Sequence, residues 1–164
     1  MVPLQALLDQ LSGWVYSVAF LLVPGAVATV CWTPFLLSGR LRALFAELPP
    51  FDSPYATYGL VGLAASLPFV VGVGAALVGV DTEGPRAGGR MANAILTTVL
   101  PLSVGYVVGA PLVGVLGLPR VGVDWDPTGY GVSTWALLAA GGAWYAAVFA
   151  VPLTLFSLVL AFPA

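Results

Sequence analysis

The sequence predicts an all-α, polytopic membrane protein in which four transmembrane helices form one bundle, accompanied by short amphipathic helices at the interface. Of its 164 residues, 60% are hydrophobic and only 7% are charged, whereas a soluble domain typically carries about 25% charged residues. The apolar residues fall in runs of about 20, a length that matches the roughly 30 Å hydrocarbon core of a bilayer. We therefore expect a multi-pass protein of the cell membrane, with the lipid bilayer as a partner.

Four apolar runs contain no acidic or basic residue. They predict spans at roughly residues 14–38, 58–80, 91–118 and 132–162 of a single integral membrane domain that covers residues 1–164. Four spans place both termini on the same side of the membrane. The arginines are divided too evenly between the two sides to decide the orientation. The side opposite the termini carries more acidic residues, which favours cytoplasmic termini.

Two short segments show the spacing of an amphipathic helix, with apolar residues at i, i+3, i+4 and i+7. In residues 3–12 these are Leu4, Leu7, Leu8 and Leu11, and in residues 40–48 they are Leu41, Leu44, Phe45 and Leu48. Such a stripe can lie at the headgroup boundary of a membrane, so we expect two interfacial helices. The first segment could instead extend the first span, because only Gly13 separates the two.

Each predicted span contains a proline, and small residues recur at a spacing of four residues. Gly105 and Gly109 are the sharpest pair, since they lie at the centre of the third span. Small residues at this spacing let two helix backbones approach closely. The pair predicts a packing face inside the bundle or, as the alternative, a seam between two copies of the chain.

The third span also carries four polar side chains, which are those of Asn93, Thr97, Ser103 and Tyr106. They could line a polar crevice, as a small permease or channel component would require. The alternative is that their hydroxyl groups bond to their own helix backbone or to a neighbouring helix.

The loop at residues 120–131 concentrates polar and aromatic side chains. The stretch Asp126-Pro127-Thr128-Gly129 has the residue order of a type I turn, and Ser133 or Thr134 could cap the helix that follows. Two carboxylates are too few for a calcium site, which takes about six to eight oxygen ligands. We expect an exposed loop with aromatic anchors, which would face a partner through Asp124, Trp125, Asp126 and Tyr130.

The composition argues against several classes of function. There is no histidine and no lysine. The chain therefore lacks the histidine of a catalytic triad and the lysine of a phosphate-binding loop. The single Cys31 rules out an internal disulfide, and a net charge of −2 does not suit nucleic acid. We expect no catalytic residue, no cofactor and no metal site. An intramembrane enzyme that used tyrosine, serine, threonine, Cys31 or the loop carboxylates stays open.

Two functions remain. The first is a non-enzymatic subunit, scaffold or accessory factor of a larger membrane assembly, whose partner is another membrane protein or a second copy of the chain. The alternative is a small permease or channel component. The missing lysine and the scarcity of asparagine and isoleucine indicate a GC-rich genome. Together with the excess of acidic residues, they would also suit a halophilic archaeal origin.

Overall fold

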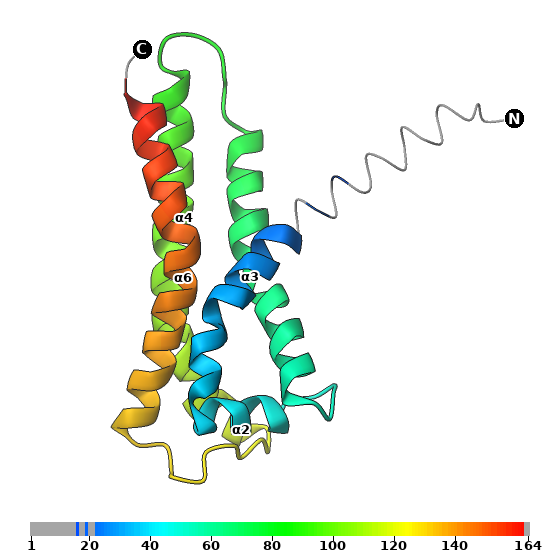
Figure 1. Cartoon of the computed structure of the whole chain (residues 1–164). Coiled ribbons are helices and arrows are strands. Elements are labelled where there is room, and N and C mark those ends of the chain that lie inside the picture. Colours follow the sequence, from blue (N-terminus) through cyan, green and yellow to red (C-terminus); the bar gives the residue numbers. More distant parts are fainter. Residues whose placement is uncertain (1–15, 17–18, 20–21, 163–164) are drawn as a thin grey trace, which may run out of the picture.

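The computed structural model describes residues 22–162 together with Tyr16 and Ala19, and all regular structure in this part of the chain is helical (Figure 1). The elements in chain order are a first helix Leu22–Leu37 that ends as the 3-10 helix η1 (Thr33–Leu37), then α2 (Gly39–Glu47), α3 (Pro54–Val78), α4 (Ala87–Pro111), the π-helix η2 (Leu112–Gly117), α5 (Leu118–Arg120) and α6 (Val132–Ala161). The predicted helical class is therefore confirmed. The amphipathic helix expected at residues 3–12 and the beginning of the first predicted span lie outside the described residues.

The first helix and α2 meet at a sharp bend of 118°. Ser38 interrupts the helix there with an extended backbone (φ −69°, ψ 119°). Arg42, in α2, donates to the carbonyl oxygens of Leu36 at 2.7 Å and Leu37 at 3.3 Å. Carbonyl groups at the end of a helix lack partners within it, so the arginine stabilises the bend. A helix at residues 40–48 is confirmed to within a residue at either end.

α3 begins at Pro54, one turn earlier than the span predicted from residue 58. Ser53 accepts a hydrogen bond from the amide of Ala56 at 3.5 Å, as an N-cap residue does. Proline is also favoured at the first position of a helix. The apolar run does not reveal residues 54–57, because the first turn of α3 is marked by the serine cap and the proline and not by a run of apolar residues.

α4, η2 and α5 follow one another as a single rod, Ala87–Arg120, that lies beside α6 (Figure 1). Two glycines allow the backbones of α4 and α6 to approach each other closely. A Cβ added at Gly142 would collide with the backbone carbonyl oxygen of Tyr106, and one added at Gly88 would collide with that of Leu160. A larger residue fits at either position only if the two helices separate.

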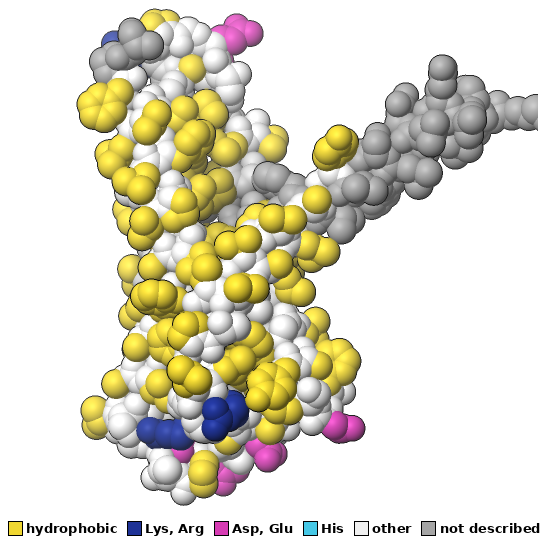
Figure 2. Space-filling model, viewed as in Figure 1, with side chains coloured by type: hydrophobic (Ala, Val, Ile, Leu, Met, Phe, Trp, Pro, Cys, Tyr) yellow, Lys and Arg dark blue, Asp and Glu magenta, His cyan; other side chains and the backbone are white. Residues whose placement is uncertain are grey.

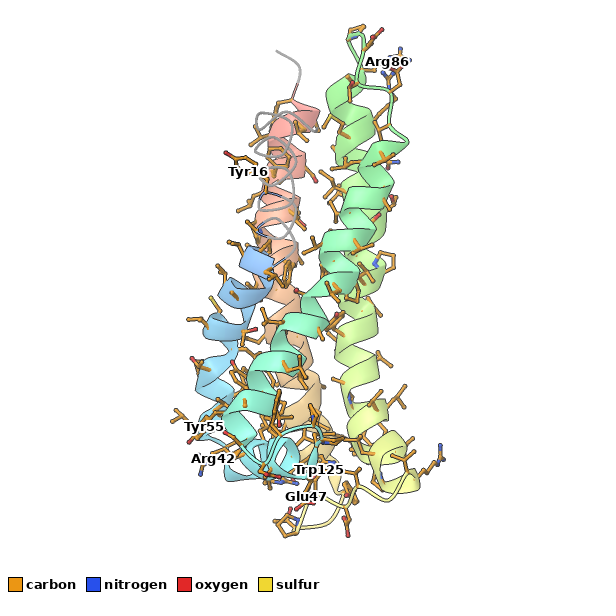
Figure 3. All side chains as sticks on the ribbon, turned by 90° about the vertical axis from the view of Figure 1, so that its right-hand side faces the viewer. Tyr16, Arg42, Glu47, Tyr55, Arg86 and Trp125 are labelled. Carbon is orange, nitrogen blue, oxygen red and sulfur yellow. The ribbon has the colours of Figure 1, made fainter. Side chains whose placement is uncertain are left out.

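Three of the described helical stretches are long and apolar enough to cross a membrane, namely α3, the rod and α6. The bent pair formed by the first helix and α2 would be a fourth. On the face shown in Figure 2 the charged side chains lie at the ends of the helices, and hydrophobic side chains cover the length between them. Arg86 marks one end, while Arg42 and Glu47 mark the other (Figure 3). These features are compatible with a location in a membrane.

The described residues form two hydrophobic clusters in the interior. The central cluster joins the first helix, α3, α4 and α6 through Ala28, Phe69, Val70, Ile95, Val99, Tyr145, Ala146 and Phe149. The second lies at the α2 end and consists of Leu41, Leu44, Val115, Trp125 and Leu138. The apolar stripe of α2 therefore packs on the protein itself. The same cluster places Trp125, from the loop before α6, against Val115 of η2.

Candidate functional site

An apolar cleft of about 600 Å³ opens between α3 and the rod, with further walls from the first helix, α2 and α6. Its lining on α3 runs from Tyr58 to Pro68, and its lining on the rod runs from Pro101 to Leu118. The described residues that line it carry no ionisable acid or base other than tyrosine, and nearly all of the surface they expose is carbon. The cleft can therefore hold an apolar group, but it presents no charge to one.

Gly105 and Gly109 lie in the wall of this cleft. A Cβ added at either glycine would meet no atom within 4 Å, so neither residue is in close contact with another described helix. Tight contacts between described helices are made at other glycines instead, such as Gly88 and Gly142 between α4 and α6, and Gly62 of α3 against Thr29 of the first helix. The structure thus places the predicted pair on an open wall, and a seam between two copies stays a prediction.

Two tyrosines link the far walls of the cleft to the backbone of α3. Tyr145 of α6 donates to the carbonyl oxygen of Gly62 at 2.5 Å, and Tyr106 of α4 donates to that of Ala65. Both carbonyl groups lie in the turns that precede Pro68. The carbonyl group that loses its helical amide to Pro68 is that of Ala64. The tyrosines instead bond to carbonyl groups that keep a second lone pair for a side-chain donor.

Aromatic rings form the α2 end of the cleft. Trp32 stacks on Tyr58 with ring centroids 5.7 Å apart, and Phe45 meets Tyr58 edge-on at 5.4 Å. The indole nitrogen of Trp32 donates to the carbonyl oxygen of Gly141 at 2.7 Å, and the hydroxyl of Tyr58 donates to that of Thr29. Because these polar atoms are used within the protein, the rings offer mainly carbon to the cleft.

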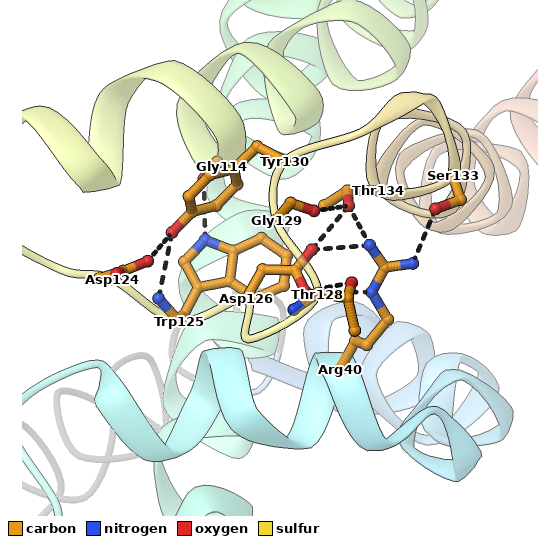
Figure 4. A network of polar contacts seen from close by, with 10 residues as sticks. All are labelled: Arg40, Gly114, Asp124, Trp125, Asp126, Thr128, Gly129, Tyr130, Ser133 and Thr134. Atoms are coloured by element: carbon orange, nitrogen blue, oxygen red, sulfur yellow. Dashed lines mark hydrogen bonds and ion pairs between the residues drawn. The ribbon is translucent and has the colours of Figure 1, made fainter.

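A buried carboxylate joins two distant parts of the chain at the same end of the molecule (Figure 4). Asp126 Oδ2 lies 2.7 Å from Arg40 Nη2, and Oδ1 accepts from Arg40 Nε at 3.3 Å. Thr134 donates to Oδ2 at 2.6 Å, and Thr128 donates to Oδ1 through its hydroxyl at 2.7 Å and its amide at 3.0 Å. Arg40 Nη1 also donates to Ser133 at 3.1 Å. We call these five residues the Asp126 network.

The network determines the protonation state of its carboxyl group. Burial raises the pKa of Asp126, but the hydrogen bonds from Arg40, Thr134 and Thr128 outweigh burial and hold that pKa well below the usual range. The group is ionised at neutral pH. An acid–base catalyst works best with a pKa near the ambient pH, so the geometry suits a structural ion pair better than proton transfer.

The loop expected to face outward is folded inward at its centre. Trp125 is 2% exposed and Asp126 is 4% exposed. The indole nitrogen of Trp125 donates to the carbonyl oxygen of Gly114 in η2 at 2.8 Å. Tyr130 is partly buried and donates to Asp124 at 2.7 Å. Asp124 alone of these four loop residues is exposed, so the expectation that Trp125 and Asp126 face outward is corrected.

The predicted turn itself is present. The amide of Gly129 donates to the carbonyl oxygen of Asp126 at 3.1 Å. Gly129 has a φ of +80°, which glycine adopts without the strain that a side chain would cause. The predicted cap was wrong, because Gly131 is the N-cap residue of α6 and the hydroxyl of Thr134 is bound to Asp126.

The polar residues of the third predicted span do not share one crevice. Tyr106 lines the cleft, Ser103 lines a separate groove, and Asn93 and Thr97 are exposed. Thr97 donates to the carbonyl oxygen of Asn93, and Ser103 donates to that of Val99, each at 2.8 Å. These are bonds to the preceding turn of the same helix. The described residues therefore form no continuous polar path along this stripe.

The partner of Asp126 is not evident from the local sequence. A usable signal existed, because Arg40 and Asp126 fall in loops that the predicted topology places on the same side. A carboxylate that leaves water needs a charged partner, and arginine matches a carboxylate in two-point geometry. What was missing was any sign that Asp126, rather than Asp124, would be the buried residue.

Comparison with known proteins gives one match. The model of a protein family described as "Domain of unknown function (DUF8162)" matches residues 12–164. The chain matches none of the curated proteins and none of the solved structures.

Proposed function

The chain belongs to the DUF8162 family, and we propose that it is a non-enzymatic membrane protein that serves as a subunit, scaffold or accessory factor of a larger membrane assembly. In this proposal the first helix, α3, the rod and α6 each cross the bilayer once. Both termini then lie on one side, which we place in the cytoplasm. α2 lies at the opposite interface, with one face on the protein.

The position of the charges supports the membrane location. Of the described charged residues, those on helices lie at or near helix ends, and the others lie in the connecting loops. Arg90, near the start of α4, is paired with Asp81 of the preceding loop at 3.2 Å. A charged side chain at the centre of a bilayer is costly, so this distribution is what four crossings would require.

The use of the polar groups supports a structural role. Every buried side-chain nitrogen or oxygen in the described part of the chain has a hydrogen-bond partner. The Asp126 network joins α2 to α6, and the tyrosines of the cleft join α4 and α6 to α3. These groups hold the helices together, which is what a scaffold needs.

The observation that carries the proposal is a shallow groove of about 360 Å³ on the outer face shared by α4 and α6. Its lining consists of small and β-branched residues, which are Ser103, Val104, Val107, Val108, Ala143, Ala146, Ala147, Ala150 and Val151. Within a bilayer, helices associate where small residues let their backbones approach. We propose that a transmembrane helix of the partner protein packs into this α4–α6 groove.

Filling the groove tests the proposal. Ala143→Leu with Ala147→Leu would obstruct it, and Ala75→Leu on the exposed side of α3 is the matched control, since Ala75 lines neither the groove nor the cleft. The complex would be extracted from its own membranes in mild detergent at native salt and sized. We expect the double variant to lose the larger species and the control to keep it. A wild-type chain that runs as a strict monomer without a partner, or a double variant that keeps the complex, would refute the proposal.

A further inference from the structure

We propose that the cleft between α3 and the rod binds one hydrocarbon chain of a membrane phospholipid, whose phosphate lies beside Arg120. This site is separate from the α4–α6 groove, and it rests on the proposed membrane location.

The lining selects an apolar occupant. The walls expose almost only carbon, and the polar atoms of the tyrosines on α4 and α6 already bond to the backbone of α3. A polar ligand would lose its hydrogen bonds to water in such a cleft and find few to replace them. A hydrocarbon chain makes no hydrogen bonds to water, so it loses none when it enters the cleft.

The shape suits an elongated occupant. The lining on α3 from Tyr58 to Pro68 extends about 15 Å, and that on the rod from Pro101 to Leu118 extends about 25 Å, at about 1.5 Å per residue. The volume of about 600 Å³ is spread along this length. A hydrocarbon chain is long, thin and flexible, so it can follow such a cleft from one end to the other.

The charge at one end selects the headgroup. Three ionisable residues adjoin the lining at the α2 end, namely Arg42, two residues before Leu44, Glu47, next to Leu48, and Arg120, two residues beyond Leu118. Arg42 already donates to the carbonyl oxygens of Leu36 and Leu37. Arg120 is exposed and forms no ion pair with any residue between 22 and 162. Arginine binds phosphate oxygens in two-point geometry, and the end of a spanning helix is where the phosphates of a bilayer lie. The phosphate is accordingly placed at Arg120 and not at Glu47.

The glycines of the cleft provide a clean test. Gly109→Leu projects a side chain into the cleft where an added Cβ meets no atom within 4 Å, and Gly74→Leu adds the same side chain to α3 at an equally open position outside the lining. The purified proteins in detergent would be titrated with phosphatidylglycerol, and bound lipid would be counted by native mass spectrometry. We expect one tightly bound lipid in the wild type and in Gly74→Leu, and a loss of at least about tenfold in affinity in Gly109→Leu.

Arg120→Gln tests the headgroup. We expect affinity for phosphatidylglycerol to fall about fivefold, the size of one arginine contact with an anionic lipid, and affinity for uncharged diacylglycerol to stay the same. Equal affinity of Arg120→Gln and wild type for phosphatidylglycerol would overturn the placement of the phosphate. Equal binding by Gly109→Leu and Gly74→Leu would overturn the site.

The outcomes separate this site from the proposed function. One outcome is that Gly109→Leu dissociates the protein complex while the wild type binds no lipid. The cleft would then bind a segment of the partner protein, and the proposed lipid site would be wrong. If lipid bound as expected while the groove variants kept their complex, only the scaffold proposal would fail. A chain recovered in the soluble fraction without detergent would remove the membrane location that both share.

Discussion

Arg40, at the start of α2, and Asp126, in the loop before α6, form a two-point ion pair across 86 residues of sequence, with Nη2–Oδ2 and Nε–Oδ1 distances of 2.7 and 3.3 Å. The carboxylate has no exposed surface, and the arginine side chain is 23% exposed. The pair fastens the loop against α2 and holds the end of the bundle together.

Asp126→Asn should destabilise the fold, because it leaves the guanidinium of Arg40 partly buried without its counter-charge. Breaking a fully buried pair costs about 3–5 kcal/mol, and the partial exposure of Arg40 reduces this to about 2–3 kcal/mol. The measurement is the free energy of unfolding in detergent. The control is Asp124→Asn, since Asp124 is exposed and, among residues 22–162, is bound only by Tyr130. Equal losses in the two variants would contradict the prediction.

Stability should fall in acid through the same group. The pKa of Asp126 in the folded chain lies below its value of about 3.9 in an unfolded chain. Its contribution is complete above about pH 5 and is lost as the pH falls through about 4 toward the lowered pKa. Unfolding free energies of the wild type and Asp126→Asn would be compared between about pH 6 and pH 3. The difference between them should shrink in acid, and a constant difference would count against the ion pair.

Trp125→Phe should cost about 1–3 kcal/mol. The change keeps most of the ring packing in the second cluster but removes the donor to the carbonyl oxygen of Gly114, which is left buried and unpaired. Trp135→Phe is the control, because Trp135 is partly buried and its indole makes no hydrogen bond within the described part of the chain. Thermal unfolding followed by circular dichroism measures both. A smaller loss for Trp125→Phe than for Trp135→Phe would show that the hydrogen bond contributes little.

Gly142→Ala should disrupt the contact of α4 with α6. The added Cβ would collide with the carbonyl oxygen of Tyr106, which belongs to a helix backbone and cannot turn aside. Overpacking of this kind costs about 1–3 kcal/mol. Gly74→Ala adds the same methyl group to α3 where it meets nothing within 4 Å, and it should be neutral or slightly stabilising. If both variants unfold at the same denaturant concentration as the wild type, the helices are not in the tight contact described.

Much of the helical pattern could be predicted because it follows from one-dimensional signals. The apolar runs predict α3, the rod and α6, and the spacing of Leu41, Leu44 and Phe45 predicts α2. The turn at residues 126–129 follows from the order of Asp, Pro and Gly. Each of these helices and the turn depends on residues that are close together in the sequence, and such residues are also close together in the folded chain.

The contacts between helices could not be predicted in this way. Gly105 and Gly109 have the four-residue spacing of a packing face, and so do Gly88 with Ala92 and Gly142 with Ala146. Of these four glycines, Gly88 and Gly142 meet a neighbouring backbone, while Gly105 and Gly109 do not. Which face of a helix meets another depends on the tilt and rotation of both, and neither is encoded in the spacing. The burial of Asp126 likewise depends on Arg40, which is distant in sequence.

The π-helix η2 has six residues, Leu112–Gly117, and its wider turn carries Gly114, whose carbonyl oxygen receives the indole of Trp125. A π-turn contains one residue more than an α-helix would use for the same advance. Deleting one of these residues would let the rod return to regular α-helix, with the residues beyond the deletion in nearly their present orientation. The docking of the loop is therefore sensitive to the number of residues in this segment as well as to their identity, because the wider turn that offers the carbonyl oxygen of Gly114 to the indole of Trp125 would be lost even if both residues were kept.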